Sequence, residues 1–361
     1  MKKQLMISIV LTMLFFTSNE SFGAVLVNTG GKSNGSSLSG EAGPKGINQT
    51  VTLRKSGGSI KQAKARGLFS KTNVNLGNQV VSKGTPGDPK LTHVDANSIF
   101  AGTGTFMSDD GNPVENFTIG VDVHGTLKCK SNAMSTFFSI AQTGVELTID
   151  DESKFSGTAT QDGTGPFFDS GDLSGQFQMG ANIAMIDKQF PINLGTLEDG
   201  QKLPFLFIGT TLVSYGEKVG IKFCSADFLK TSSFEPLPGQ KGTLDLEAGK
   251  EVTVVYVDND TSVISGNEKL LIESQDSNLI NNIKPGSVKV VFPTNVTYDA
   301  DAGPPGDINS NGLTDSELTV GGSSTTLATT ISSRGINTLV VYGQTTNGEV
   351  FFGLLDVGKL K

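Results

Sequence analysis

Residue types that usually carry catalysis and metal binding are scarce in this chain of 361 residues. It has no tryptophan, only two cysteines and only two histidines, His93 and His124. Their spacing excludes a metal pair of the H-E-x-x-H kind, and there is no cysteine cluster. Acidic pairs such as Asp109-Asp110 lie in predicted turns and are typical of solvated surface. We therefore predict that the protein is not an enzyme. The remaining enzymatic alternative is an extracellular hydrolase that uses loop carboxylates.

Long apolar segments are also absent after the first 16 residues. Met1–Lys3 is basic, Leu5–Phe16 is a nearly unbroken apolar run, and small residues follow at Gly23 and Ala24. This order is that of a Sec-type signal peptide, with cleavage expected near Gly23 or Ala24. No later window approaches the length of a membrane span, so we predict no transmembrane segment. The mature protein is expected at the cell surface, in a fimbrium or secreted.

Glycine, by contrast, is abundant and punctuates the chain at short intervals, with 45 residues in all. The runs between glycines alternate with a period of two, and segments with a period of 3.6 are few. The only stretches with helical character are short, at Ser131–Ser139 and Leu279–Ile283. This pattern predicts an all-β fold, an antiparallel immunoglobulin-like β-sandwich with long Gly/Asp-rich loops.

The two cysteines each end a run of alternating side chains. Val121, Val123 and Leu127 precede Cys129, and Val219–Phe223 precedes Cys224. Period-two alternation indicates half-buried strands, and an exported protein meets an oxidising compartment. We therefore predict one disulfide, Cys129–Cys224, that pins one sheet to another. The alternative is a pair of free buried thiols.

Charge divides the chain into a basic and an acidic part. Residues 25–92 contain ten Lys or Arg and two acids, a net of +8, whereas residues 93–361 contain 16 basic and 33 acidic residues, a net of −17. The basic part is poor in large apolar residues, which favours weak structure. We predict four regions: a signal peptide at 1–23, a partly ordered basic arm at 24–92, a disulfide-bonded β domain at 93–233, and at 234–361 a C-terminal β region packed on it or a second β domain.

The basic arm is a candidate receptor-binding region. Arg and Lys suit sulfate and carboxylate acceptors, so a host glycan or a sulfated glycolipid is the expected partner. Nucleic acid is not expected, because the protein is exported and its acidic body repels phosphate. Two alternatives are contact of the arm with an acidic face of another copy and a solvated linker. The candidate residues are Arg54, Lys55, Lys61, Lys64 and Arg66.

An acidic loop near the C-terminus is a candidate calcium site, and calcium is the only cofactor that the sequence suggests. Asp307, Asn309 and Asn311 alternate before Gly312, as oxygen ligands do in a calcium-binding loop. The twelfth position counted from Asp307 is Leu318, where a bidentate carboxylate would belong, so Asp315 or Glu317 would have to substitute. The alternative is a solvated acidic turn.

The segment from Phe117 to Asp227 resembles subunits of chaperone–usher pili. Gly125–Cys129 matches the strand that ends in the first cysteine, Pro191–Gly195 (PINLG) the middle motif, and Val219–Cys224 (VGIKFC) the strand that ends in the second. The resemblance implies an incomplete immunoglobulin-like sandwich and, as partners, other pilus subunits and a periplasmic chaperone and usher. No alternating donor strand follows the signal peptide, which suits a tip subunit.

These observations predict a secreted surface protein, a fimbrial minor subunit or adhesin that mediates attachment to host-cell glycoconjugates. The alternative is a free secreted calcium- or carbohydrate-binding β protein that is not assembled into a pilus.

Overall fold

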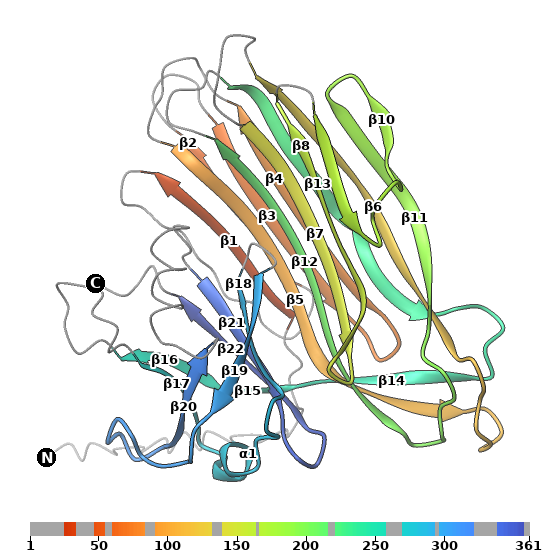
Figure 1. Ribbon diagram of the computed structural model, residues 1–361, viewed down its shortest axis with the longest axis vertical. Helices are drawn as coiled ribbons and strands as arrows, with labels where there is room; N and C mark the ends of the chain where they lie inside the picture. The colour runs from red at the N-terminus through yellow and green to blue at the C-terminus, as the bar shows by residue number, and fades with distance from the viewer. Residues whose placement is uncertain are drawn as a thin grey trace, which may run out of the picture.

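Strands dominate the computed structural model of this protein. It describes residues 25–33, 47–54, 60–83, 91–131, 139–163, 166–215, 221–257, 269–292, 296–320 and 338–356. Over these ranges the chain forms three sheets and one short helix, α1 (Ser277–Asn281), so the predicted all-β class is confirmed. Two sheets pack face to face as an elongated sandwich, and the third lies against the lower part of it (Figure 1). Within the described ranges, no helix has the length and apolar character needed to cross a membrane.

The first sheet is built around β5, which is 18 residues long. One half of β5 pairs with β1 and the other half with β14, because the two partners are too short to cover it. The strands of this sheet run in the order β1 (Val25–Ser33), β5 (Leu91–Ser108), β12 (Lys202–Tyr215), β7 (Ser139–Ile149), β8 (Glu152–Asp162) and β9 (Phe167–Gly171), with β14 (Gly242–Ala248) beside β5.

The second sheet also has seven strands, and its strand β6 shows the pattern that the sequence predicts. Val121 and Val123 are fully buried, while Asp122 and His124, which alternate with them, are half-buried. Alternate side chains therefore face the sandwich core and the outer surface. The strands run in the order β10 (Gln178–Gly180), β11 (Ile183–Asn193), β6 (Thr118–Ser131), β13 (Ile221–Pro236), β4 (Val74–Lys83), β3 (Ile60–Phe69) and β2 (Ile47–Arg54).

Phenylalanine rings join the two sheets in the sandwich core. Phe234 of β13 stacks on Phe205 of β12, with ring centroids 5.1 Å apart, and meets Phe207 edge-on at 5.4 Å. Phe100 of β5 lies 6.3 Å from the same ring. All four side chains are fully buried, and aromatic side chains bury more apolar area than most others. The rings therefore hold the two sheets face to face.

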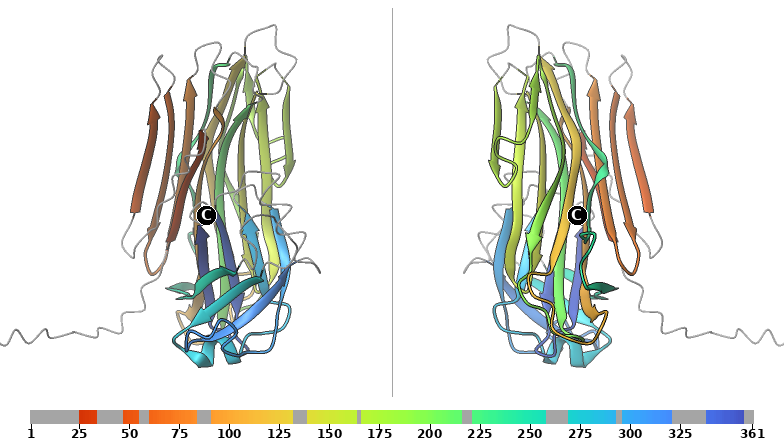
Figure 2. Two further views of the ribbon diagram at one scale, coloured as in Figure 1. Left: turned by 90° about the vertical axis from the view of Figure 1, so that its left-hand side faces the viewer. Right: turned by 90° about the vertical axis from the view of Figure 1, so that its right-hand side faces the viewer.

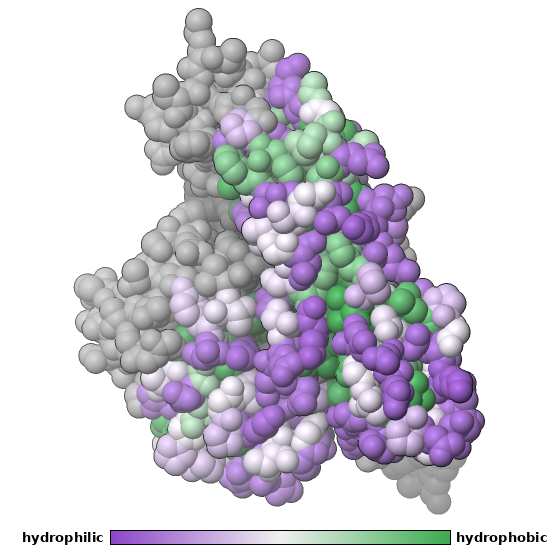
Figure 3. Space-filling view, turned by 45° about the vertical axis from the view of Figure 1, so that its right-hand side comes forward, coloured by the Kyte–Doolittle hydropathy of each residue, from purple (hydrophilic) through white to green (hydrophobic). Residues whose placement is uncertain are grey.

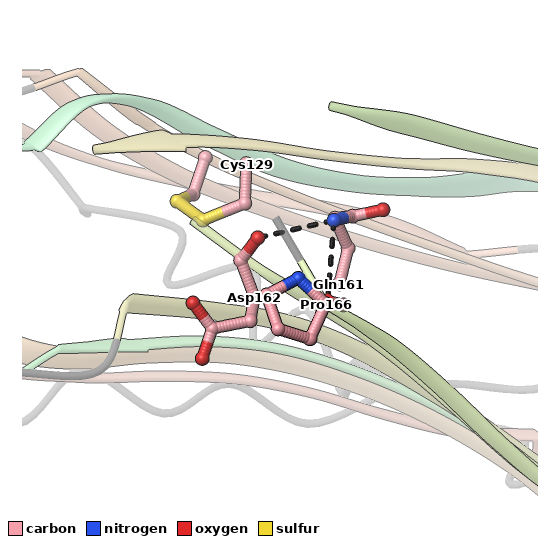
Figure 4. Close-up of a disulfide and its surroundings, with 5 residues drawn as sticks. Cys129, Gln161, Asp162 and Pro166 are labelled. Atoms are coloured by element: carbon pink, nitrogen blue, oxygen red, sulfur yellow. Dashed lines mark hydrogen bonds between the residues drawn. A yellow bond between two sulfur atoms is a disulfide. The ribbon is translucent and has the colours of Figure 1, made fainter. Parts of the chain in front are cut away.

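The disulfide Cys129–Cys224 is present as predicted, but it does not link two sheets. Cys129 of β6 and Cys224 of β13 lie opposite each other on neighbouring antiparallel strands of the second sheet, with their Cα atoms 4.0 Å apart. The expectation that the bridge pins one sheet to another is therefore wrong, because alternation specifies the face of a residue and not its strand partner. The bridge is buried and lies near Gln161 of the facing sheet, whose Nε2 donates to the carbonyls of Asp162 and Pro166 (Figure 4).

The third sheet has eight strands, with a core of its own. Its two edge strands, β15 and β16, are separated in the chain only by Val252. The N–H of Val252 donates a hydrogen bond to the carbonyl of Phe352 in β22 at 2.8 Å, so the sheet curls back on itself. β21 and β22 form an antiparallel hairpin near the C-terminus. The order is β15 (Lys250–Glu251), β22 (Val350–Asp356), β21 (Thr338–Gln344), β18 (Val288–Phe292), β19 (Val296–Ala302), β20 (Thr314–Val320), β17 (Lys269–Ser274) and β16 (Thr253–Val257).

An apolar contact docks the third sheet on the outer face of the first. The two side views show the third sheet at the lower part of the sandwich (Figure 2). Ile208 of β12 and Phe352 of β22 belong to this cluster and are fully buried or nearly so. Beside it, the Asp151 carboxylate accepts hydrogen bonds from Lys284 Nζ at 2.9 Å and from Gln344 Nε2 at 2.8 Å. The remaining members of the apolar cluster are Ile99, Ala101, Leu206, Val291, Val340, Tyr342 and Val350.

Strands from the predicted basic arm and from the predicted C-terminal region belong to the two sheets of the sandwich. The region expected as a basic arm, 24–92, contributes β1 to the first sheet and β2, β3 and β4 to the second. The end of β13 and all of β14, expected in the C-terminal region, also belong to the sandwich. The sandwich therefore extends from β1 to β14, and the C-terminal unit starts at β15. The predicted signal peptide, 1–23, lies outside the described residues.

Candidate functional site

The acidic loop between β19 and β20 is closed at its neck by a β-bridge. The N–H of Gly306 donates to the carbonyl of Asp315 at 2.9 Å, and the N–H of Asp315 donates to the carbonyl of Gly306 at 2.6 Å. The chain turns inside the loop through Ser310 and Gly312, which have φ values of 59° and 84°. Positive φ costs glycine little, which explains why glycine follows the third oxygen-bearing residue. The loop is thus a closed ring held at both ends by strands.

Inside the ring, the alternating side-chain oxygens accept backbone N–H groups. Asp307 accepts from Asn311 N at 2.9 Å and from Gly312 N at 3.2 Å. Asn309 Oδ1 accepts from Asn311 N at 3.2 Å, and Asn311 Oδ1 accepts from Leu313 N at 2.8 Å. Asp and Asn favour such local bonds, which fold the backbone around their own oxygens. Each oxygen keeps a further lone pair.

Asp315 is the most buried member of the loop, with no exposed surface. Its Oδ2 accepts hydrogen bonds from Ile308 N at 2.9 Å and from Asn309 N at 3.2 Å, so the carboxylate points into the ring. Its Oδ1 is buried and has no hydrogen-bond partner among the described residues. A buried carboxylate oxygen without a partner is costly, because it has lost its water and gained nothing in return.

Glu273 is a site residue that the sequence did not suggest. It lies on β17 directly opposite Asp315 of β20, and only 5% of its surface is exposed. Its Oε2 accepts hydrogen bonds from the side-chain amides of two asparagines, from Asn309 Nδ2 at 3.4 Å and from Asn311 Nδ2. Nothing in the local sequence around Glu273 indicates this contact, because it depends on the pairing of β17 with β20.

The two buried carboxylates lie on the face of the sheet that the loop covers. Their neighbours Ile272 and Leu318 belong to the core on the opposite face, as strand alternation requires. Leu318 therefore cannot reach the ring. Of Asp315 and Glu317, the two carboxylates that the sequence offers in its place, Asp315 contacts the loop. Neither Glu273 nor Asp315 forms an ion pair with a basic side chain in the described ranges. Like charges directly opposite each other on paired strands repel.

Carboxylates alone do not make this a metal centre. In the part of the chain that the structure describes, no group of three or more His, Cys, Asp and Glu side chains is arranged to hold an ion. A site in the ring would need the Asn carbonyl oxygens as well, which is the ligand chemistry of calcium and not of zinc.

The basic candidates converge on one hairpin at the edge of the second sheet. Arg54 ends β2, and Lys61, Lys64 and Arg66 lie on β3, which pairs with β2 on one side and β4 on the other. Lys64 is half-buried. Lys55 lies outside the described residues. The structure therefore brings the four described candidate positions together on adjacent strands.

The other candidates are ordinary surface features. His124 of β6 pairs with the Asp187 carboxylate on the neighbouring strand β11. A hollow of about 510 Å³ opens at the end of the sandwich, between the turn at residues 110–116 and the turn at 239–241, and polar atoms predominate in its lining. Asp110 and Lys241 stand at its edge, but it holds no buried charged side chain.

No family model matches the chain, and no curated protein matches it significantly.

Proposed function

We propose that this protein is an exported surface protein, a minor fimbrial subunit or tip adhesin that attaches to host-cell glycoconjugates. The observation that carries the proposal is the gathering of Arg54, Lys61, Lys64 and Arg66 on the β2–β3 hairpin, at the edge of an otherwise acidic protein. Arg forks and Lys ammonium groups suit sulfate and carboxylate acceptors. A hairpin at the rim of a rigid sandwich can reach a glycan without any change in the core.

The buried disulfide supports export, since such bonds persist in oxidising compartments and are rare in the cytosol. It also ties β6 to β13 in the middle of the second sheet, which stiffens the scaffold beneath the hairpin.

The strand edges support a role in assembly. β9 and β10 each end a strand order and pair with a neighbour on one side. Large apolar side chains are exposed on this side of the sandwich, with Phe168 63%, Met179 54% and Met185 43% exposed. Apolar patches among polar residues are visible on the face that Figure 3 brings forward. An open edge with apolar neighbours is suited to strand addition by another subunit or a chaperone.

Adhesion is tested by coating beads with the mature protein and measuring how many bind to immobilised sulfated glycans or to host cells. Binding should weaken steeply as salt rises, because exposed charges are screened beyond about 8–10 Å at physiological ionic strength. Changing Arg54, Lys55, Lys61, Lys64 and Arg66 together to Gln should abolish binding without lowering the melting temperature.

The matched control changes five exposed lysines outside the hairpin to Gln and should leave binding nearly unchanged. If both variants lose binding equally, attraction is non-specific, and if neither does, the receptor site lies elsewhere. The control lysines are Lys128, Lys130, Lys188, Lys202 and Lys241.

Assembly is tested separately, by shearing cells and locating the protein with an antibody. Recovery in the sheared fibre fraction is the expected result. Recovery only as free protein in the medium would favour the second candidate, a free secreted calcium- or carbohydrate-binding β protein. The closed acidic ring at residues 306–315 is the observation that favours this candidate.

A further inference from the structure

We propose that the ring of residues 306–315 binds a calcium ion, and that Glu273 of β17 orients two of its ligands. The first-sphere side chains are Asp307, Asn309, Asn311 and Asp315. This inference is independent of the adhesive role, because the site lies in the C-terminal unit and the basic hairpin lies in the sandwich.

The unpartnered oxygen of Asp315 is the starting point. Its Oδ2 is used by the amides of Ile308 and Asn309, which fixes the carboxylate in the ring, yet its Oδ1 is buried and bonded to no described residue. A buried charge persists when it is paired or coordinates a metal. No basic side chain in the described ranges forms an ion pair with Asp315. A cation from solution can therefore bind to the free lone pairs of its Oδ1 atom.

Charge balance points the same way. Glu273 and Asp315 stand opposite each other on paired strands, both nearly or fully buried, and Asp307 adds a third carboxylate to the ring. Like charges directly opposite each other on paired strands repel, and in the described ranges no basic side chain forms an ion pair with Glu273 or Asp315. A divalent cation bound by Asp307 and Asp315 relieves this repulsion.

Glu273 determines which way the two asparagine amides face. An ionised carboxylate only accepts hydrogen bonds, so Asn309 and Asn311 must present their NH₂ groups to Glu273 Oε2, as they do. Their Oδ1 atoms then face the ring, where each bonds one backbone N–H and keeps a lone pair. Glu273 is thus a positioning residue, which acts on the ion through the two amides.

The ligand chemistry selects calcium over magnesium. Calcium accepts six to eight oxygens in flexible geometry, from carboxylates, Asn carbonyls, backbone carbonyls and water. Asp307, Asn309, Asn311 and Asp315 fall at positions 1, 3, 5 and 9 of such a loop, and Gly312 falls at the position that requires glycine. Magnesium demands a regular octahedron and holds its water tightly, so a ring built from carbonyl oxygens favours it less.

The test is the thermal melting of the mature full-length protein in EDTA, in calcium chloride and in magnesium chloride. Extracellular calcium modules have dissociation constants of about 10⁻⁴–10⁻³ M, so about 10 mM calcium should raise the melting temperature of the C-terminal unit by roughly 3–10 °C. Magnesium at the same concentration should have a clearly smaller effect. A wild-type melt that is indifferent to calcium would overturn the proposal.

Two variants separate ligand from positioning roles. Asp307→Asn removes an exposed ligand charge and should strongly weaken the calcium response. Glu273→Gln should raise the dissociation constant about 10- to 100-fold, the usual cost of losing a partner that orients metal ligands. If Glu273→Gln lowers the melting temperature in EDTA but leaves calcium affinity unchanged, Glu273 is only structural and that part of the proposal fails. The control, Asp301→Asn, removes an exposed charge of β19 and should leave the response intact.

Discussion

The sandwich and the C-terminal unit both carry acidic turns, and the two turns differ in burial. In the sandwich, Asp110 is exposed, and the backbone N–H of Asn112 and the Ser108 hydroxyl donate to its carboxylate. The hydrogen bond from Asn112 is the main reason that the pKa of Asp110 lies below its usual value. In the C-terminal unit, Asp315 is buried and one of its oxygens has no partner among the described residues.

Alternating Asp and Asn residues therefore do not by themselves make a binding site. At Asp110 local donors and water satisfy the carboxylate, so no ion is needed. At Asp315 the loop and the strand pairing exclude water and bring a second carboxylate, Glu273, to the same place. The cost of burial, and not the sequence pattern, marks the second turn as a binding site.

The two units also differ in how they are stabilised. The sandwich has a disulfide and a continuous core that joins both of its sheets. The C-terminal unit has a smaller core, no cysteine, and an apolar docking face shared with the sandwich. We therefore expect changes to the bridge to act on the sandwich alone, and changes at the docking face to act on the coupling between the units.

The largest effect is expected from removing the disulfide. The bridge closes a loop with a sequence separation of 95, so replacing Cys129 and Cys224 by Ala should cost about 4–5 kcal/mol of the free energy of unfolding. Urea unfolding of the sandwich measures this loss. The calcium response of the C-terminal unit should not change, and if it disappears the two units are not independent in the way described.

A smaller effect is expected at the docking face. Ile208→Ala leaves a cavity against the third sheet and should cost about 3 kcal/mol. Calorimetry should then resolve two melting transitions, because the lost contact is the one that couples the units. The matched change Ile149→Ala, in the sandwich core, should lower stability by a similar amount without separating the transitions. Identical traces for both variants would contradict a docking role.

The smallest effect is expected at the polar rim of the same face. Lys284 bonds Asp151, and this hydrogen bond is the main reason that the pKa of Lys284 is raised. Because the pair is partly exposed, Lys284→Met should cost only about 0.5 kcal/mol. A raised pKa means that the stabilisation is complete below the unfolded-state value of about 10.4 and is lost as the pH rises through the folded-state value. The difference between wild type and variant should therefore be constant from pH 7 to 9 and decrease as the pH rises above about 10.4.

Much of the fold follows from local pattern. Alternation over Val121, Val123 and Leu127 predicts the strand β6. The bridge can be predicted because the chain has only two cysteines. The strand features depend on a few neighbouring residues, which is why a single sequence reveals them. The short helix α1 overlaps the helical stretch expected at Leu279–Ile283 for the same reason.

Features that depend on distant pairing could not be predicted. The bridge lies within one sheet because β6 pairs with β13, and no local pattern specifies that partner. The strands β1 to β4 form in a segment that the sequence predicts to be weakly structured. β1 pairs with β5, β4 pairs with β13, and β3 and then β2 extend the sheet from β4. The same reason hides Glu273, which reaches the acidic loop only through the pairing of β17 with β20.

The central claim is that the burial of Asp315, and not the presence of an acidic turn, creates a cation site. Calorimetric titration of calcium into wild type, Asp315→Asn and Asp110→Asn tests it most directly. Melting in EDTA confirms that each variant is folded before it is titrated. The account predicts one calcium ion per chain for wild type and for Asp110→Asn, and no measurable binding for Asp315→Asn. Equal binding by all three proteins, or loss of binding in Asp110→Asn alone, would contradict it.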